Sequence, residues 1–217
     1  MRNTFKKLPL ERQTAIMETA AGVFARKGYF QANVAEICEV AGISMGSLYK
    51  YFENKKVLFI DVFQFFSERM FIDLLNVNLS EDDDSIYDTV LVLLQKVEQD
   101  KNIEAAGHFA AIYLDIGSQS MNEFATCVSR RIEIEAKKFW LSLIKKGKQR
   151  GEIHPSVDDE LAAYLIDNNF MIFVFTFISE HYRQRFDGYL GEEKEELTVD
   201  ERIQKVMKTL RFILRGS

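Results

Sequence analysis

The 217-residue chain is 47% apolar and contains 18 Phe but only 2 Pro and 11 Gly. This composition favours long uninterrupted helices and argues against strands separated by turns, so the expected fold class is all-α. The net charge of −5 by itself argues against a nucleic-acid binder, but residues 1–56 carry nine Lys or Arg against five Asp or Glu. The N-terminal part therefore suits a polyanion, which would repel the acidic remainder.

Apolar residues at helical spacing predict a first long helix, and they are Ile16, Ala20, Val23 and Phe24. The run stops at Lys27-Gly28, where a basic last turn is followed by a glycine suited to a C-cap.

Residues 33–52 then predict two short helices joined by a tight glycine turn. Asn33 can cap the first of them, and Glu36 can reach back to complete a capping box. Gly42 ends this helix, and Ser44 supplies the N-cap of the next one.

The second short helix of this pair has an inner and an outer face. Leu48 and Phe52 fall four residues apart and point inward. The outer face is small and able to form hydrogen bonds, and it consists of Met45, Gly46, Ser47, Tyr49 and Lys50. This is the layout of a helix-turn-helix DNA reader, which needs such side chains where it meets phosphates and base edges.

Beyond residue 54, apolar periodicity predicts six further helices, over about 55–74, 86–97, 103–116, 122–150, 156–185 and 199–214. Ser156 is expected to cap the fifth of these, whose first turn is acidic. The chain thus divides into a three-helix head, residues 1–54, and a larger helical body, residues 55–217.

No catalytic or metal-binding motif is present in the sequence. The three histidines, His108, His154 and His181, are dispersed without the spacing of a metal site. The GxSxG motif of a nucleophile elbow does not occur. The pair Gly147-Lys148 does not complete a phosphate-binding loop, because that motif needs a glycine five residues before Gly147 and position 142 is Ser. We therefore expect no metal, no cofactor and no enzyme activity.

The sequence also indicates a cellular compartment. The first residues lack the apolar core of a signal peptide, and the longest apolar run, 170–178, is far too short to span a bilayer. Cys38 and Cys127 form neither a CxxC pair nor a disulfide framework, which favours a reducing environment. A cytoplasmic protein without membrane association is expected.

Over residues 16–63 the chain resembles the N-terminal DNA-binding domain of TetR-type transcriptional regulators. The resemblance rests on motifs in the family's order and spacing: Ala20-Ala21 with Phe24, Lys27-Gly28-Tyr29, Val34 with Ile37, Ala41-Gly42-Ile43-Ser44, Gly46-Ser47-Leu48-Tyr49-Lys50-Tyr51-Phe52, and Asn54-Lys55 with Leu58-Phe59. It implies a homodimeric, all-helical repressor with one operator half-site for each head and a ligand cavity in each body.

The resemblance also carries site residues over to this chain. The DNA contacts that it implies are Ser44, Met45, Gly46, Ser47, Tyr49, Lys50 and Tyr51 on the recognition helix, and Lys55 as a phosphate contact at the next helix start. The family commonly has Lys in place of Met45 and Thr in place of Ala32, so affinity or sequence preference is expected to differ from the family pattern.

Aromatic and Met residues in the body are dense, with a few polar neighbours. Core filling is one explanation, and an apolar cavity with a few orienting groups is the other. The second explanation predicts a hydrophobic or aromatic effector bound by Phe63, Phe66, Met70, His108, Phe109, Tyr113, Trp140, Asn169 and Phe173.

The last two predicted helices offer a face for dimerisation. The helix over 156–185 is apolar in its middle, and the last helix carries a stripe formed by Ile203, Val206, Met207, Leu210, Ile213 and Leu214. Pairing two copies would form a four-helix bundle and bury such residues.

The sequence therefore predicts a ligand-responsive homodimeric repressor that binds a palindromic operator in double-stranded DNA. The alternative is a helical lipid-binding or small-molecule-binding protein whose head has lost DNA binding, a hypothesis motivated by Met45 and Ala32.

Overall fold

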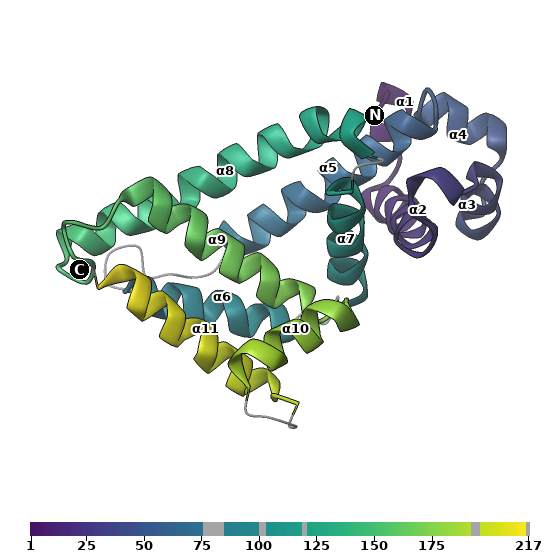
Figure 1. Ribbon diagram of the computed structural model, residues 1–217. Coiled ribbons are helices and arrows are strands. Elements are labelled where there is room, and N and C mark those ends of the chain that lie inside the picture. The colour runs from purple at the N-terminus through teal and green to yellow at the C-terminus, as the bar shows by residue number, and fades with distance from the viewer. Residues whose placement is uncertain (76–84, 100–102, 119–120, 192–195, 216–217) are drawn as a thin grey trace. The chain divides into compact units, whose positions relative to one another are not determined.

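The computed structural model describes residues 1–75, 85–99, 103–118, 121–191 and 196–215, without the side chains of 70–75, 99, 103–106, 123 and 125–132. These residues form eleven helices and no strand, which confirms the all-α class (Figure 1). The helices are α1 (Asn3–Lys6), α2 (Leu10–Gln31), α3 (Val34–Ala41), α4 (Met45–Tyr51), α5 (Lys55–Leu75), α6 (Ile86–Gln99), α7 (Ile103–Ile116), α8 (Asn122–Gln149), α9 (Asp159–Phe175), α10 (Glu180–Leu190) and α11 (Val199–Leu214).

The chain packs into two compact units, each built from two stretches of sequence. Unit 1 consists of Met1–Ile72 and Glu104–Arg131, and unit 2 consists of Asp73–Ile103 and Ile132–Ser217. Unit 1 therefore holds more than the helix-turn-helix, because it also contains most of α5, most of α7 and the start of α8. The functional boundary between residues 54 and 55 stays a prediction, since packing does not test it.

In unit 1, α2 breaks at the glycine where the sequence predicts a stop. Gly28 has φ 68° and ψ 168°, outside the helical region, and one more turn follows to Gln31. Behind this break, aromatic rings from distant parts of the sequence meet edge to face. The Tyr29 ring centroid lies 5.1 Å from that of Phe59 and 4.5 Å from that of Phe124. This cluster joins the end of α2 to α5 and α8.

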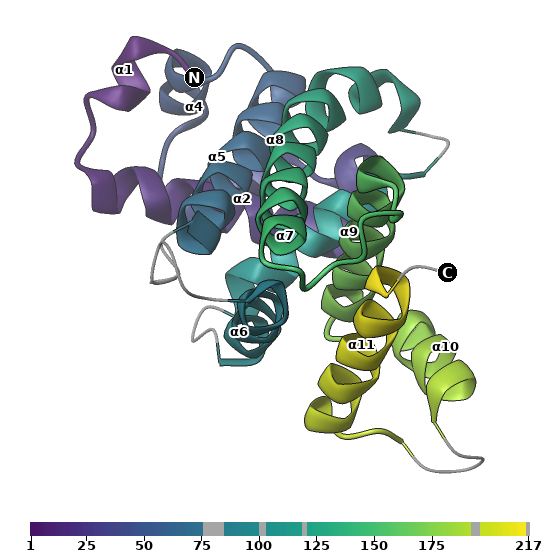
Figure 2. The same ribbon diagram turned by 90° about the vertical axis from the view of Figure 1, so that its left-hand side faces the viewer.

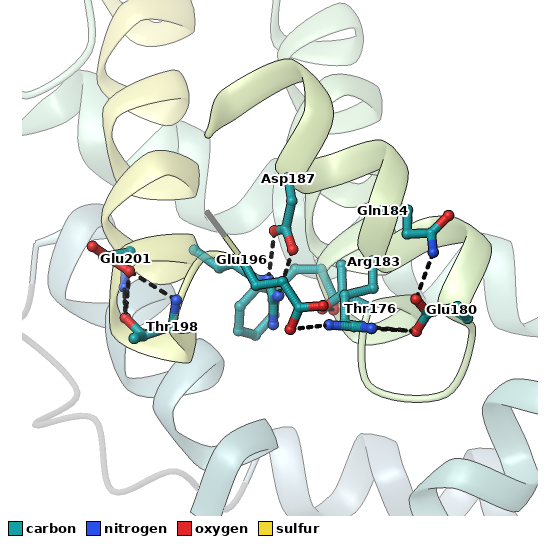
Figure 3. Close-up of polar contacts among 10 residues, drawn as sticks. Thr176, Glu180, Arg183, Gln184, Asp187, Glu196, Thr198 and Glu201 are labelled. Carbon is teal, nitrogen blue, oxygen red and sulfur yellow. Dashed lines mark hydrogen bonds and ion pairs between the residues drawn. The ribbon is translucent and has the colours of Figure 1, made fainter. Parts of the chain in front are cut away.

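In unit 2, the helices α6, α9 and α11 run alongside one another and enclose the core (Figures 1 and 2). Leu93, Ile144 and Phe173 are fully buried there. The helix α11 begins with a capping box between Thr198 and Glu201 (Figure 3).

The apolar stripe of α11 lies inside unit 2 and does not form an outer face. Leu210 is 3% exposed and Leu214 is fully buried, both in the core shared with α6 and α9. The prediction that this stripe forms a dimer face is therefore wrong, because the same chain already covers it.

One predicted helix, over 156–185, is in fact two. The helix α9 begins after Asp158, whose carboxylate accepts a hydrogen bond from the Leu161 backbone N–H at 2.7 Å, so Asp158 and not Ser156 is the cap. The helix ends at Phe175, and its C-cap, Thr176, donates its hydroxyl to the Phe173 carbonyl at 2.7 Å. Tight backbone bonds over 176–179 close the turn before α10 starts.

The two halves, α9 and α10, meet at a bend of 119°. Within the described residues, no single helix is long and apolar enough to cross a membrane, and these two pass that test only as this bent pair.

Charged side chains hold α10 against α11 and the segment before it (Figure 3). Arg202 donates to both carboxylate oxygens of Asp187 at 3.0 and 2.8 Å, with side chains only 7% and 11% exposed. Arg183 pairs with Glu180 on its own helix and with Glu196 at 2.6 Å. Because the Arg202 pair is nearly dry and bidentate, removal of one partner would leave a buried charge.

Candidate nucleic-acid interface

The first helix of the helix-turn-helix, α3, starts as its sequence predicts. Asn33 Oδ1 accepts a hydrogen bond from the Ala35 backbone N–H at 2.9 Å. The Glu36 carboxylate does not close the predicted capping box, because it pairs with Lys27 at 2.5 Å and lies 3.8 Å from Arg26. The acid therefore ties α3 to the end of α2.

The turn and the second helix also follow the predicted caps. Gly42 has φ 61° and ψ 42°, a left-handed conformation that favours glycine. Ser44 Oγ accepts from the Ser47 backbone N–H at 3.0 Å, as an N-cap does. Leu48 and Phe52 are fully buried, which fixes the inner face of α4.

A cation that the sequence does not single out holds the turn itself. The Arg12 guanidinium, from α2, donates to the carbonyls of Ala41 and Gly42 at 3.0 and 3.2 Å. These carbonyls end α3 and have no partner within that helix. A contact over about thirty positions leaves no local signal in the sequence.

The remaining side chains of α4 form its outer surface. Met45 and Tyr49 are 39% and 43% exposed, and Ser44, Gly46 and Lys50 are exposed as well. Ser47 is half-buried, with its hydroxyl 2.9 Å from that of Ser44.

Tyr51 differs from its neighbours on α4 because its ring faces the core of the head. It lies 5.6 Å from the Phe5 ring and is half-buried. Phe5 is fully buried, and its ring centroid also lies 4.9 Å from that of Phe52 in a tilted arrangement. The helix α1 therefore lies beside α4 (Figure 2). Residues 1–9 contain no apolar periodicity that would predict this arrangement.

Lys55 stands in the first turn of α5 with partners in the head. Its ammonium donates to the Phe30 carbonyl at 3.1 Å and lies 4.8 Å above the Tyr29 ring. Burial lowers the pKa of this ammonium below its ordinary value. Asn54 caps the helix by accepting from the Val57 backbone N–H at 2.9 Å. A phosphate contact by Lys55 stays a prediction. It would use the ammonium N–H groups that do not bond to the Phe30 carbonyl.

The predicted effector residues fall into two groups, and the first lies in unit 1. Phe63 stacks on Phe109 at 5.0 Å, with Tyr113 at 6.2 Å. Phe66 is buried, and His108 lies against Gly22, where an added Cβ would be 3.2 Å from its ring. The predicted member Met70 lies outside the described side chains.

The second group of predicted effector residues lies in unit 2. Trp140 Nε1 donates to Asp167 Oδ1 at 2.7 Å. Burial raises the pKa of the Asp167 carboxyl above its ordinary value, and the hydrogen bond from Trp140 opposes that shift. Phe173 is fully buried, and the Asn169 amide donates to the Leu165 carbonyl of its own helix at 2.7 Å. Within the described part of the chain, no group of three or more His, Cys, Asp or Glu could hold a metal ion.

The capped turn, the exposed outer face of α4 and its buried inner face define a helix-turn-helix DNA-binding transcriptional regulator. The family model described as bacterial regulatory proteins, tetR family, matches residues 16–62. The HTH-type transcriptional repressor KstR2 of Rhodococcus jostii (strain RHA1) is 28% identical over 152 residues, which are 70% of this chain and 72% of that protein. The match identifies residues 16–62 as a DNA-binding domain of the TetR family type, and the similarity to this repressor extends over most of the chain.

Solved structures with low sequence identity share the fold. The fatty acid degradation regulator FadR from Bacillus halodurans has a TM-score of 0.71 at 19% identity, over 97% of this chain and 100% of that one. The transcriptional regulator FadR from Bacillus subtilis, solved in complex with stearoyl-CoA, has a TM-score of 0.61 at 20% identity, over 94% and 98%.

Proposed function

We propose that this regulator is a homodimeric repressor that binds a palindromic operator through α4 and leaves it when an apolar small molecule binds the body. The observation that carries the proposal is the composition of unit 1. The helix-turn-helix packs in the same compact unit as α7 and the stacked rings of Phe63, Phe109 and Tyr113. A ligand that displaces these rings therefore acts on the unit that holds the DNA reader.

The DNA contacts in this proposal are the residues of the outer face of α4. The hydroxyls and backbone near Ser44 and Gly46 suit phosphates or base edges, and Tyr49 suits a phosphate contact. Lys6, Lys7 and Lys50 are exposed cations in the same part of the chain. Salt dependence of binding is expected, since each neutralised phosphate releases counterions.

The effector class follows from the ring-rich interior of both units. Phe63 and Phe109 in unit 1, and Trp140 and Phe173 in unit 2, offer apolar contacts. Asp167 is a half-buried polar group that is hydrogen-bonded to Trp140. Apolar walls with few polar groups favour a long-chain or polycyclic apolar molecule. Of these two classes, the long-chain molecule is supported by analogy of fold, because the Bacillus subtilis regulator was solved in complex with stearoyl-CoA.

Dimerisation is proposed to use the outer faces of α9 and α11. Leu161, Tyr164 and Ile172 are 57%, 65% and 37% exposed and fall within one face of α9. Phe212 on α11 is 82% exposed. Exposed apolar side chains on the outer faces of two helices are typical of an interface between copies, and two such helices from each copy would form a four-helix bundle.

A binding experiment tests the proposal. A duplex is first selected from randomised DNA by the wild-type protein, and its release is then followed by fluorescence anisotropy as stearoyl-CoA, oleic acid or cholestenone is added. We expect at least one of these probes to weaken operator binding by tenfold or more and to raise the melting temperature of the protein. Tight binding of a probe with no change in operator affinity would contradict the coupling. Failure to select any duplex would favour the alternative of a ligand-binding protein without DNA binding.

A further inference from the structure

Backbone carbonyls at the C-terminal end of α4 accept hydrogen bonds from the start of the sequence. Arg2 Nη1 donates to the Tyr49 carbonyl at 3.1 Å, and Thr4 Oγ1 donates to the Lys50 carbonyl at 2.7 Å. The Arg2 backbone N–H donates to the Tyr51 carbonyl at 3.1 Å. Three consecutive residues of the recognition helix thus have a partner in residues 2–4.

These bonds matter because α4 is short. It has seven residues, and the last four carbonyls of any α-helix lack partners inside the helix. A helix of this length has almost no stability of its own in water, so outside contacts set its position. The bonds from Arg2 and Thr4 cross 47 and 46 positions of sequence, and they fix α4 relative to the segment that carries them.

The segment itself is anchored in the core of the head. Phe5 follows directly after Thr4, is fully buried, and packs 4.9 Å from the Phe52 ring at the end of α4. At the opposite end of α4, Arg12 holds the carbonyls of the preceding turn. Residues from the first twelve positions therefore hold both the C-terminal end of the recognition helix and the turn that precedes it, in each case through backbone carbonyls.

We propose that Arg2 and Thr4 are positioning residues for operator recognition. They hold the backbone of α4 so that its outer side chains meet base edges in register, and they read no base themselves. The inference rests on the proposed role of α4 as the DNA reader. It goes beyond that role because it assigns sequence discrimination to residues that do not belong to the helix-turn-helix.

Thr4 gives the sharper test, because its side chain is uncharged. The variant Thr4→Val keeps the shape of the side chain and removes only the hydroxyl that donates to the Lys50 carbonyl. The variant Thr4→Ser restores the hydroxyl. The variant Thr14→Val, at a half-buried threonine of α2, makes the same chemical change away from α4 and serves as the matched control.

Binding is measured by anisotropy on two duplexes, the one selected from randomised DNA by the wild-type protein and a scrambled duplex of the same composition. We expect Thr4→Val to weaken binding to the selected duplex by about fivefold to tenfold, the effect of one lost hydrogen bond. Binding to the scrambled duplex and the salt slope are expected to stay as in the wild type, since no phosphate contact is lost. Thr4→Ser and Thr14→Val are expected to bind both duplexes like the wild type.

Arg2 needs a control for its charge. The variant Arg2→Gln removes the guanidinium, while Lys6→Gln removes an exposed charge from the same segment and leaves the bonds to α4 in place. We expect Arg2→Gln to lower the ratio of selected to scrambled affinity, and Lys6→Gln to leave that ratio unchanged. A salt slope shallower by about 0.9 on both duplexes, with an unchanged ratio, would make Arg2 a phosphate contact and overturn its positioning role.

The outcomes separate this inference from the function on which it rests. If the wild-type protein selects no duplex, the proposed function fails. If it selects a duplex and Thr4→Val binds that duplex with wild-type affinity, the function stands and the positioning role is overturned. The same conclusion follows if Thr4→Val loses affinity for the selected and the scrambled duplex by the same factor.

Discussion

The backbone N–H of Tyr29 donates to Asp115 Oδ2 at 3.1 Å and so ties the end of α2 to the end of α7. Gly28, directly before Tyr29, has φ 68°, and a Cβ added there would lie 3.4 Å from the same carboxylate oxygen. The final turn of α2 therefore follows the position of α7. Since α7 also carries Phe109 and Tyr113, this bond is a direct link from the stacked rings to the head.

Removal of the Asp115 carboxylate is predicted to weaken that link. We expect Asp115→Ala to bind the selected duplex within a few fold of wild type, and to need a higher concentration of an active effector probe for release. Asp115→Asn keeps an acceptor oxygen and is expected to respond more like the wild type. Anisotropy titrations of both variants check this, and a normal response of Asp115→Ala would mean that the signal takes another route.

Tyr49 is predicted to be needed for DNA binding but not for folding. Its ring is 43% exposed on α4, so Tyr49→Ala is expected to lower operator affinity by at least about tenfold while thermal stability stays within about 0.5 kcal/mol. The variant Tyr189→Ala, at a more exposed tyrosine of α10, is the matched control. Equal operator affinity in both variants would remove Tyr49 from the interface.

Met45 tests how the first turn of α4 meets DNA. Its side chain is 39% exposed, so Met45→Lys can be accommodated, and one new phosphate contact would steepen the salt slope by roughly one unit on any duplex. If Met45 packs against a thymine methyl, the same variant weakens the selected duplex and strengthens random DNA. Unchanged affinity and slope on both duplexes would show that this side chain points away from the groove.

Two leucines separate dimerisation from folding. Leu161 is 57% exposed on α9, so Leu161→Glu is expected to give folded monomers by light scattering. Leu210 is 3% exposed in the core of unit 2, so Leu210→Glu is expected to cost at least about 2–5 kcal/mol of stability, because it removes core packing and buries a charge. A dimeric Leu161→Glu would exclude this face of α9 from the interface.

Asp167 is predicted to make stability depend on pH. Its folded-state pKa is raised by burial, so the folded protein binds the proton more readily than the unfolded chain does between pH 3.8 and that raised value. The free energy of unfolding of the wild type, measured relative to that of Asp167→Asn, is therefore expected to fall as pH rises through this window. Above the window, this difference is expected to stay at its lower value. Urea unfolding followed by the fluorescence of Trp140, the one tryptophan of the chain, measures this difference. A difference between the two proteins that does not change with pH would contradict the assignment.

The parts of the fold that the sequence predicts well are those encoded within a few residues. The caps at Asn33 and Ser44 and the left-handed Gly42 lie next to the helices that they bound, and the structure has them as predicted. The sequence does not predict the break at Thr176, because the apolar run around it contains no Gly or Pro. Periodicity identifies the apolar stripe of α11 but does not indicate which surface covers it, so the sequence alone does not distinguish a dimer face from the core of unit 2.

The candidate site divides in the same way. The outer face of α4 follows from its helical period, whereas Arg2, Thr4 and Arg12 act on carbonyls about 30 to 47 positions away and leave no pattern. Composition indicates an apolar effector site but does not locate it, and the predicted effector residues lie in two separate units. Side-chain chemistry indicates what a residue can bind, but the contacts between distant segments decide where it does so.

The bonds between residues 2–4 and α4 also have a practical consequence for anyone who purifies this regulator. A peptide tag fused immediately ahead of Arg2 would begin beside the carbonyls of the recognition helix, in the region where DNA is expected to approach. Such a tag could compete for those carbonyls or for the groove, and a weak measured affinity would then describe the fusion protein. A tag at the other end of the chain, or one removed by a protease, avoids this interference.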